Sequence, residues 1–271
     1  MVISIISLLS SIILTNLSTA REKARISSLQ QYFESTDHAI RTDLIGEWKF
    51  NSSNETIDTS GFGQNLKERS GVKKQSSGGY NGKGDYLFTG SDSLLYTQLK
   101  QVPSAKMTLL AWIKLDDSAN RDNRNSYTVV KNWGNNNPGS FHVEVYNNIM
   151  DYKFGGIVLS SNMSAYNPSI TVTTGKWHLV GFTADGSKVT EIVDGVLGKS
   201  STYTGTFKTD FLCLGIGAKP NDECNGIATA QGSFKGEIDD VRLYSSGLSL
   251  SEIQKVYAEG LEKHNDTLAS K

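Results

Sequence analysis

Two Asp-Gly pairs, at 185–186 and 194–195, constrain the fold of this chain more than any other feature of its sequence. Each pair ends a run rich in Val, Ile, Thr, Phe or Trp, at 177–185 and 188–194. Asp-Gly supplies the backbone angles that a tight two-residue turn between antiparallel strands requires. The two runs are therefore predicted to be consecutive strands of a β-meander.

The run 108–115 also alternates with period two, as a strand of a β-sandwich does. One face of this run is apolar and the other is mixed: the first holds Leu109, Ala111, Ile113 and Leu115, and the second Leu110, Trp112 and Lys114. The 26 Gly against 4 Pro, placed between such runs, supply turns. We predict a mainly β body over residues 44–260.

The end of this body is marked by a helix signal. Ser249 and Glu252 form a capping box ahead of the apolar positions of 253–257, which predicts a short closing helix. Residues 261–271 are predicted to be a polar tail. The tryptophans in strand patterns are predicted to be core residues: Trp48, Trp112 and Trp177.

The charge balance excludes one class of partner. The formal net charge is −1, so the chain has no global basic field to gather nucleic acid. We expect no nucleic-acid partner.

The two cysteines leave two interpretations open. Cys213 and Cys224 are separated by a stretch with Pro220 that is able to turn, so a disulfide is predicted if the chain matures outside the cytosol. Two free thiols are the alternative. No paired histidines or CxxC accompany them, which argues against a metal site.

The N-terminal segment is apolar and then amphipathic. Residues 1–20 carry no charged side chain and are long enough, as a helix, to cross a hydrocarbon core of about 30 Å. A cleaved secretory peptide is the alternative, but the basic start that such peptides need is missing. No Gly or Pro interrupts the chain before Gly46, so one helix is predicted over residues 1–43, spanning a membrane in its first half.

This segment resembles the N-terminal helix of type IV pilins and type II secretion pseudopilins, through the runs 2–9 and 18–25. The resemblance implies anchoring in an inner membrane by residues 1–20, an extracytoplasmic or cell-surface head, and other pilin subunits as partners. The Gly-Phe-Thr-Leu-Ile-Glu run that precedes the apolar stretch in that family is absent. Either the start was assigned too late, or the chain is not a processed pilin.

The body resembles the laminin G-like, concanavalin A-like jelly-roll family of add-on modules. The phrases that carry the likeness are spread over the whole body, at 46–50, 58–65, 108–114, 129–131, 175–180, 193–197 and 236–244. The resemblance implies a jelly-roll β-sandwich. It does not fix a function, because this fold hosts lectins, adhesins, hydrolases and structural modules.

Glu237 and Asp239 provide a test of the hydrolase possibility. Glucanases of this superfold place carboxylates on one strand as Glu-x-Asp-x-x-Glu or Glu-x-Asp-x-Glu, and this chain lacks the third acid, with Arg242 at the longer spacing. Strict alternation would put Glu237, Asp239 and Val241 on one face. We therefore expect the chain not to be an enzyme, with a carbohydrate-active hydrolase as the weaker alternative.

The segment 58–65 suggests a structural Ca²⁺ site, a cofactor that often accompanies this family resemblance. Asp58, Asn65 and Asp240 are the predicted ligands, because Ca²⁺ takes carboxylate, amide and carbonyl oxygens from flexible loops. Alternation would turn Asp240 away from Asp239. The alternative is that Asp58 only forms a turn with its own backbone.

A glycan site needs an aromatic face beside polar groups. Trp133 lies in a polar stretch rich in asparagine, which makes it the first candidate, with Asn135 beside it and Tyr152 and Tyr166 as companions. The predicted function is an anchored, pilin-like surface protein that presents a lectin-like domain for adhesion or for binding a polysaccharide or glycoprotein. A structural minor pilin that binds no small ligand is the alternative.

Overall fold

The chain divides into two compact units, Met1–Thr42 and Asp43–Lys271. The computed structural model describes residues 23–24, 27–28, 40–51, 56–69, 71–75, 79, 84–103, 105–117, 126–132, 134, 141–148, 151–155, 157–159, 163–165, 170–204, 206–207, 209–229 and 232–264.

The first unit is described only in short helical pieces. Residues 23–24, 27–28 and 40–42 are helical, and the Ser28 hydroxyl donates to the Ala24 carbonyl at 2.9 Å, one turn back. Within these described pieces, and in the rest of the described chain, no helix has the length and apolar character to cross a membrane. The predicted span, residues 1–20, lies outside the described residues, as does most of the predicted pilin-like helix.

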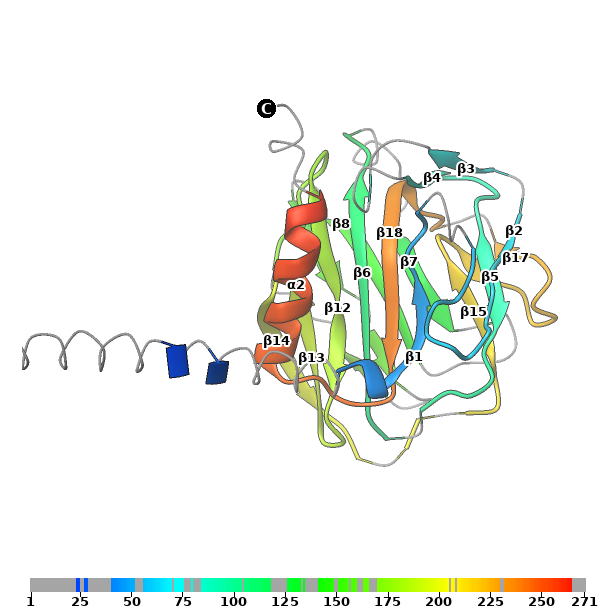
Figure 1. The fold of residues 1–271 in the computed structure, drawn as a ribbon. Helices are drawn as coiled ribbons and strands as arrows, with labels where there is room; N and C mark the ends of the chain where they lie inside the picture. The colour runs from blue at the N-terminus through cyan, green and yellow to red at the C-terminus, as the bar shows by residue number, and fades with distance from the viewer. Residues whose placement is uncertain are drawn as a thin grey trace, which may run out of the picture. The chain divides into compact units, whose positions relative to one another are not determined.

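The second unit is a sandwich of two antiparallel sheets (Figure 1). The larger has the order β14-β13-β12-β6-β18-β4-β3, with β1 also paired to β18. Its strands are β1 (Leu44–Trp48), β3 (Val72–Gln75), β4 (Asp85–Thr89), β6 (Met107–Leu115), β12 (Trp177–Ala184), β13 (Lys188–Val193), β14 (Val196–Thr202) and β18 (Lys235–Tyr244).

The smaller sheet has the order β2-β5-β15-β7-β8-β9. Its strands are β2 (Lys67–Glu68), β5 (Leu95–Gln98), β7 (Ser126–Asn132), β8 (Phe141–Asn148), β9 (Asp151–Gly155) and β15 (Cys213–Ile216). Two short hairpins lie outside these sheets: β10 (Ile157–Leu159) with β11 (Met163–Ala165), and β16 (Lys219–Pro220) with β17 (Ile227–Thr229).

The core between the sheets follows the predicted alternation of β6. Leu109, Ala111, Ile113 and Leu115 all belong to it. Trp112 lies on the opposite face and is buried there by a stacked contact with Tyr257, whose ring centroid is 5.6 Å away. Trp48 and Trp112 are thus buried as predicted, whereas Trp177, at the start of β12, is only half-buried.

Both Asp-Gly pairs lie in turns between consecutive strands: Gly186 and Ser187 are the central residues between β12 and β13, and Asp194 and Gly195 between β13 and β14. At the first, the Asp185 carboxylate accepts the backbone N–H groups of Ser187 and Lys188, each at 2.7 Å. At the second, Asp194 and Gly195 both have positive φ, at 51° and 73°, as this type of two-residue turn requires. The β-meander is therefore present.

The closing helix α2 (Leu250–His264) begins at the predicted capping box. The Glu252 carboxylate accepts the Ser249 backbone N–H at 2.7 Å, and the Ser249 hydroxyl accepts the Glu252 N–H at 3.4 Å. The helix extends through residues 261–264, which were predicted as the start of the tail, and residues 265–271 lie outside the described part of the chain. Figure 1 shows α2 lying along the face of the larger sheet on the side of β13 and β14.

Strand β18 departs from strict alternation at a β-bulge. Its pairing with β6 shifts between Asp239 and Arg242, and Asp240 has φ of 45°. An extra residue in a bulge lets two consecutive side chains face the same side. Ile238 and Val241 accordingly both enter the core, so the prediction that Val241 shares a face with Asp239 is wrong.

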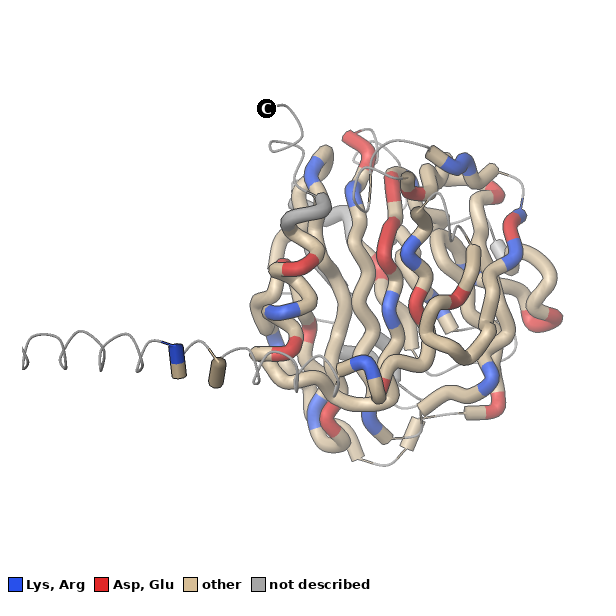
Figure 2. Tube along the Cα trace, viewed as in Figure 1, with Lys and Arg blue, Asp and Glu red and all other residues tan. Residues whose placement is uncertain are grey.

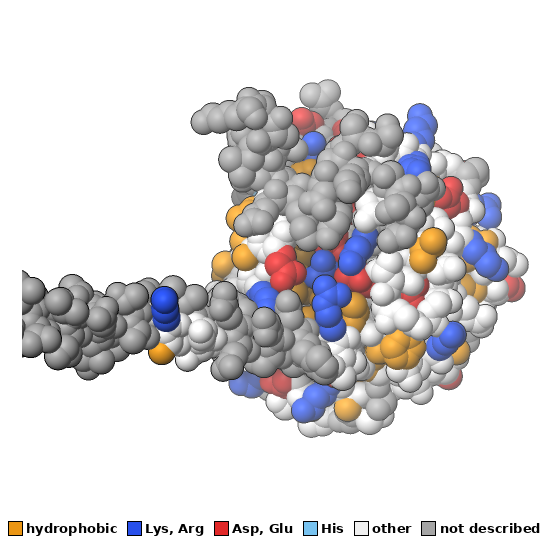
Figure 3. Space-filling model, in the orientation of Figure 1, with side chains coloured by type: hydrophobic (Ala, Val, Ile, Leu, Met, Phe, Trp, Pro, Cys, Tyr) orange, Lys and Arg blue, Asp and Glu red, His pale blue; other side chains and the backbone are white. Residues whose placement is uncertain are grey.

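A buried ion-pair network joins the first strand to the last. Arg242 donates to both carboxylate oxygens of Asp240, at 2.8 Å each, and lies 3.5 Å from a Glu47 oxygen. Glu47 is directly opposite Arg242 in the β1–β18 pairing and also contacts Lys49 at 3.2 Å. Figures 2 and 3 show charges of both signs near the middle of this face of the molecule.

Candidate functional site

One end of the smaller sheet, where β7 leads into residues 133–140, gathers polar side chains on the face away from the core. We call Lys131, His142, Glu144 and Lys219 the β7–β8 polar cluster. Lys131 is paired with His142 in the register of the two strands, while Phe141, Val143 and Val145 of β8 enter the core. Alternation therefore places His142 and Glu144 on the outer face.

Glu144 is the centre of this cluster. Its Oε1 accepts from Lys131 Nζ at 2.5 Å and from the Thr128 hydroxyl at 3.2 Å, and its Oε2 lies 3.9 Å from His142 Nε2. Glu144 is 5 % exposed and His142 7 % exposed. A buried carboxylate held by a lysine and a hydroxyl has a fixed orientation.

The electrostatics of the cluster combine a neutral imidazole with paired charges. Burial lowers the pKa of His142 to about 4, opposed by the charge of Glu144, so the ring is neutral at physiological pH. Burial also lowers the pKa of Lys219, helped by the charge of Lys131 and opposed by Asp222 and Glu144. Positively charged donors and a negatively charged acceptor thus lie close together, which suits a ligand rich in hydroxyl groups.

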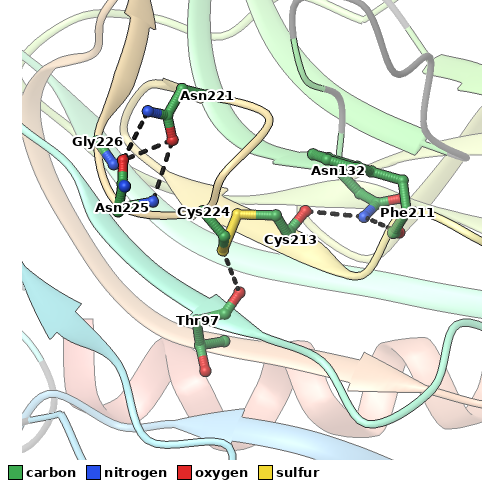
Figure 4. The surroundings of a disulfide bond; sticks show 8 residues. All are labelled: Thr97, Asn132, Phe211, Cys213, Asn221, Cys224, Asn225 and Gly226. Atoms are coloured by element: carbon green, nitrogen blue, oxygen red, sulfur yellow. Dashed lines mark hydrogen bonds between the residues drawn. A yellow bond between two sulfur atoms is a disulfide. The ribbon is translucent and has the colours of Figure 1, made fainter.

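The base of this end is fastened by Asn132 and by the disulfide Cys213–Cys224 (Figure 4). The Asn132 amide donates to the carbonyls of Phe211 and Cys213, at 2.9 and 2.8 Å, and its side chain is fully buried. The Cα atoms of the two cysteines are 5.4 Å apart, within the usual range for a bridge. Of the two interpretations of the cysteines, the structure contains the disulfide.

The loop closed by this disulfide is further ordered by Asn221. Its side-chain oxygen accepts the backbone N–H groups of Asn225 and Gly226, at 3.0 and 3.1 Å (Figure 4). Gly134 lies so close to this loop that an added Cβ would be 2.0 Å from Asp222 Oδ1. Asn132 is therefore held by hydrogen bonds, and Gly134 lies close against the disulfide loop.

Of the four residues predicted to bind a glycan, the structure describes only the backbone of Tyr152. Trp133, Asn135 and Tyr166 lie outside the described residues. The backbone of Tyr152 belongs to β9 and is paired with Asn147, near the far end of β8. Asn147 is six residues from the start of β8, about 20 Å away at the usual rise per residue. The backbone thus puts Tyr152 and Asn132 beside opposite ends of β8.

The predicted calcium ligands have other roles in the structure. The Asp58 carboxylate accepts the backbone N–H groups of Glu47, Ser60 and Gln64, at 3.0, 2.9 and 2.9 Å. The Asn65 side-chain oxygen accepts the Asp58 N–H at 3.0 Å. Together they fasten the 58–65 segment to β1, as the turn interpretation of Asp58 requires.

Asp240, the third predicted ligand, is paired with Arg242 at 2.8 Å. The bulge also invalidates the alternation argument that separated it from Asp239, because Asp239 and Asp240 both lie between two core residues, Ile238 and Val241. Among the described residues, no group of three or more His, Cys, Asp and Glu is arranged to hold a metal ion. Calcium binding stays a prediction.

A third carboxyl group, which the sequence analysis did not single out, lies beside Glu237 and Asp239 of β18. Asp85 of β4 lies beside Asp239 across the β4–β18 pairing, and both are completely buried. Burial raises the pKa of Asp85 to about 9, and the facing Glu237 and Asp239 add to the shift. Glu237 contacts Lys114 at 3.6 Å. Asp85 and Asp239 thus have no exposed surface, whereas the Glu237 side chain is 22% exposed.

Sequence reasoning missed His142 and Glu144 although a signal was present. They occupy alternate positions in the run 141–145, whose other members are apolar. Polar residues at every second position of a strand that is otherwise apolar indicate one outward face. No comparable signal existed for Asp85, because its neighbours are set by the pairing of distant strands.

The fold and these features define the chain as a jelly-roll β-sandwich of the lectin type. The family model for the concanavalin A-like lectin/glucanases superfamily matches residues 82–254, which is more than half of the chain. The protein belongs to this superfamily. No curated protein matches the sequence significantly.

Solved structures with a similar fold include binding domains of clostridial toxins. The ligand binding domain of botulinum neurotoxin serotype D, in complex with N-acetylneuraminic acid, has a TM-score of 0.59 and 17% identity over 82% of this chain and 52% of that one. The receptor binding domain of botulinum neurotoxin D gives 0.60 and 18% over 81% and 53%.

The binding domain of Paraclostridial Mosquitocidal Protein 1 has a TM-score of 0.59 and 14% identity over 80% of this chain and 52% of that one. At these identities the likeness is one of fold. The chain spans about half the length of these structures.

We predict that Asp85→Asn stabilises the protein increasingly as the pH rises. The folded protein retains a proton on Asp85 up to its raised pKa of about 9, whereas the unfolded chain releases it near the ordinary aspartate pKa of 3.8. Stability from this group therefore falls as pH rises between these values, and an asparagine does not ionise. The melting temperature of the variant minus that of the wild type should grow from pH 5 to pH 8.5.

Asp185→Asn is the matched control. Hydrogen bonds from the Lys188 and Ser187 backbone lower the pKa of this exposed aspartate. The stability that this ionised carboxylate adds is fully present above its pKa in the unfolded chain. The melting temperature of Asp185→Asn minus that of the wild type should therefore be constant from pH 5 to pH 8.5. A constant difference for Asp85→Asn as well would contradict the prediction.

The calcium prediction is tested by melting the protein with millimolar Ca²⁺ and with a chelator. A site formed only in the folded state raises the melting temperature by mass action. Asp58→Ala should lower stability in both buffers, because three backbone N–H groups lose their acceptor, and should also erase the calcium increment. Identical wild-type curves in the two buffers would leave Asp58 as a turn residue.

Proposed function

We propose that this protein is a recognition protein that binds carbohydrate at the β7–β8 end of its smaller sheet. The observation that carries the proposal is the polar cluster around Glu144, next to Asn132, which is held by hydrogen bonds, and to Gly134, which lies close to Asp222. Trp133, which lies between those two residues in sequence, is proposed to supply the aromatic face.

The chemistry of the cluster supports a sugar as the ligand. Sugar hydroxyls accept as well as donate, and the cluster offers the half-buried ammonium groups of Lys131 and Lys219 as donors, with the buried Glu144 carboxylate holding Lys131 in place. Binding sites for small polar ligands use a few fixed polar groups beside aromatic surface. One similar structure is a binding domain in complex with N-acetylneuraminic acid, which agrees with this ligand class.

The β7–β8 end of the smaller sheet is also better suited to bind a ligand than the outer face of the larger sheet. That face carries α2 against Trp112, and its charged residues are engaged with one another in the Arg242 network. The β7–β8 end instead carries half-buried charged groups, Lys131, Lys219 and Asp222, that retain access to solvent.

We further propose that residues 1–43 anchor the sandwich to a membrane as a pilin-like helix. The apolar, uncharged run of residues 1–20 and its likeness to pilins support this part of the proposal. The sandwich would then be displayed outside the inner membrane, where a disulfide is stable. Assembly with other pilin subunits, with the sandwich as a decoration of a filament, belongs to the same proposal.

Trp133→Ala is expected to weaken glycan binding by about tenfold or more, because stacking of a sugar on an indole contributes on the order of a kcal/mol. Binding is measured on immobilised glycans that include neutral and sialylated oligosaccharides. Trp177→Ala, which removes a half-buried indole from the other sheet, is the matched control and should bind as the wild type does. Equal losses in the two variants, or no glycan bound by the wild type, would refute the proposed site.

The anchor is tested by fractionating cells that express the full chain or residues 43–271 alone. The full chain should sediment with membranes and be released by detergent but not by high salt, because burial of an apolar helix does not depend on ionic strength. The shorter chain should stay in the supernatant. Full-length protein that remains in the supernatant would show that residues 1–20 do not anchor it.

A further inference from the structure

Three side chains at one rim of the larger sheet form a hydrogen-bonded series from a hydroxyl to an imidazole to a carboxylate. Thr173 Oγ1 lies 2.8 Å from His178 Nε2, and His178 Nδ1 lies 2.7 Å from Asp194 Oδ2. Thr173 precedes β12, His178 is the second residue of β12, and Asp194 belongs to the β13–β14 turn. The fold, not the sequence, brings these three positions together.

The hydrogen bonds define the protonation of the imidazole. The Thr173 backbone N–H also points at His178 Nε2, at 3.3 Å, so this nitrogen carries a lone pair and accepts. Nδ1 then carries the proton and donates it to Asp194. This is the tautomer that a histidine needs to take a proton from a neighbouring hydroxyl.

Asp194 is itself held in place. Its second oxygen accepts the Leu179 N–H at 3.0 Å, and its own backbone N–H donates to the Leu179 carbonyl at 2.9 Å. Thr173, at the other end of the series, is exposed, whereas the His178 side chain is only 12% exposed. A shielded base therefore faces a hydroxyl that a solute is able to reach.

We propose that Thr173 is a nucleophile, with His178 as its general base and Asp194 as a positioning residue, and that the site cleaves carboxylic esters of small acyl groups, such as O-acyl groups on sugars. This activity goes beyond the proposed recognition and does not depend on the β7–β8 polar cluster. A clamp between the 170–175 segment and the β13–β14 turn needs the bond from the Thr173 backbone N–H to His178 and the His178–Asp194 contact. It does not need the Thr173 hydroxyl at 2.8 Å from Nε2.

The reaction requires only the ester and water. Thr173 Oγ forms a bond to the acyl carbon while its proton passes to His178 Nε2, and the bond to the leaving alcohol breaks as that proton is returned to the alcohol oxygen. Water then attacks the acyl-threonine and gives a proton to His178. Collapse releases the carboxylic acid, and the proton on His178 restores the Thr173 hydroxyl.

The test uses the full chain and a fluorophosphonate ester, a probe that phosphonylates activated hydroxyl groups, with mass spectrometry to locate the adduct. The wild type should carry one adduct on Thr173, formed about 100-fold faster than in His178→Gln, the contribution typical of a general base. Thr173→Ser should keep the adduct at position 173 and form it faster, since a primary hydroxyl is less hindered. Thr173→Val, which conserves shape at an exposed position, should lose it.

Thr190→Val is the matched control, because the Thr190 hydroxyl contacts Ser200 at 2.8 Å instead of a histidine. It should label as the wild type does. Asp194→Asn should slow labelling and change its dependence on pH, a readout that a purely structural contact would leave unaltered. Melting curves identify any variant that fails to fold. An unlabelled wild type, or a folded His178→Gln that labels at the wild-type rate, would overturn the proposal and leave the three residues as a clamp; neither result bears on glycan binding.

Discussion

The pairing of the first strand with the last is the constraint on which the sandwich depends. Arg242 is buried, and a buried guanidinium is tolerated only with well-placed partners, here Asp240 and Glu47. The two carboxylates also keep the pKa of Arg242 above its usual value against the effect of burial. Removing one partner of a buried ion pair costs about 3–5 kcal/mol; if Asp240 were removed, Arg242 would keep only the longer contact with Glu47 at 3.5 Å and that with Glu259 at 4.0 Å.

The neighbouring segments are attached to this pairing. The Glu47 backbone N–H binds Asp58, and the Trp48 indole donates to the Gln64 carbonyl at 2.9 Å, so the 58–65 segment follows β1. Gly46 is needed beneath the Trp48 ring, where an added Cβ would lie 2.7 Å from the indole. The sequence phrases that carry the family likeness at 46–50, 58–65 and 236–244 are thus explained as one structural unit.

That unit and α2 occupy the middle and one face of the larger sheet, and the two proposed sites lie at the end of the smaller sheet and at a rim of the larger one. The recognition site uses the end of the smaller sheet that Asn132 and the disulfide fasten, so a ligand would meet groups already in place and pay little ordering entropy. The ester site uses a rim where a turn residue, a strand residue and a loop residue meet.

The sequence by itself determined the class of fold, because its signals are local. Period-two alternation in β6, the Asp-Gly turns at 185–186 and 194–195, and the Ser249–Glu252 cap each act within a few residues. The spacing of the cysteines left the disulfide open, and the position of Trp133 suggested which end of the body to consider. The alternation at 141–145 also indicated that two members of the polar cluster, His142 and Glu144, face away from the core.

Only the tertiary structure decided which distant residues meet. The bulge at Asp240 depends on pairing with β6 and moved Val241 into the core against the alternation that its sequence predicts. Asp85 meets Asp239 through the pairing of strands that are far apart in the chain, whereas Thr173, His178 and Asp194 meet through the register of the β12–β13 hairpin. A shift of one residue in such a register exchanges the faces of every side chain, so these sites are properties of the packed sheets and not of any segment alone.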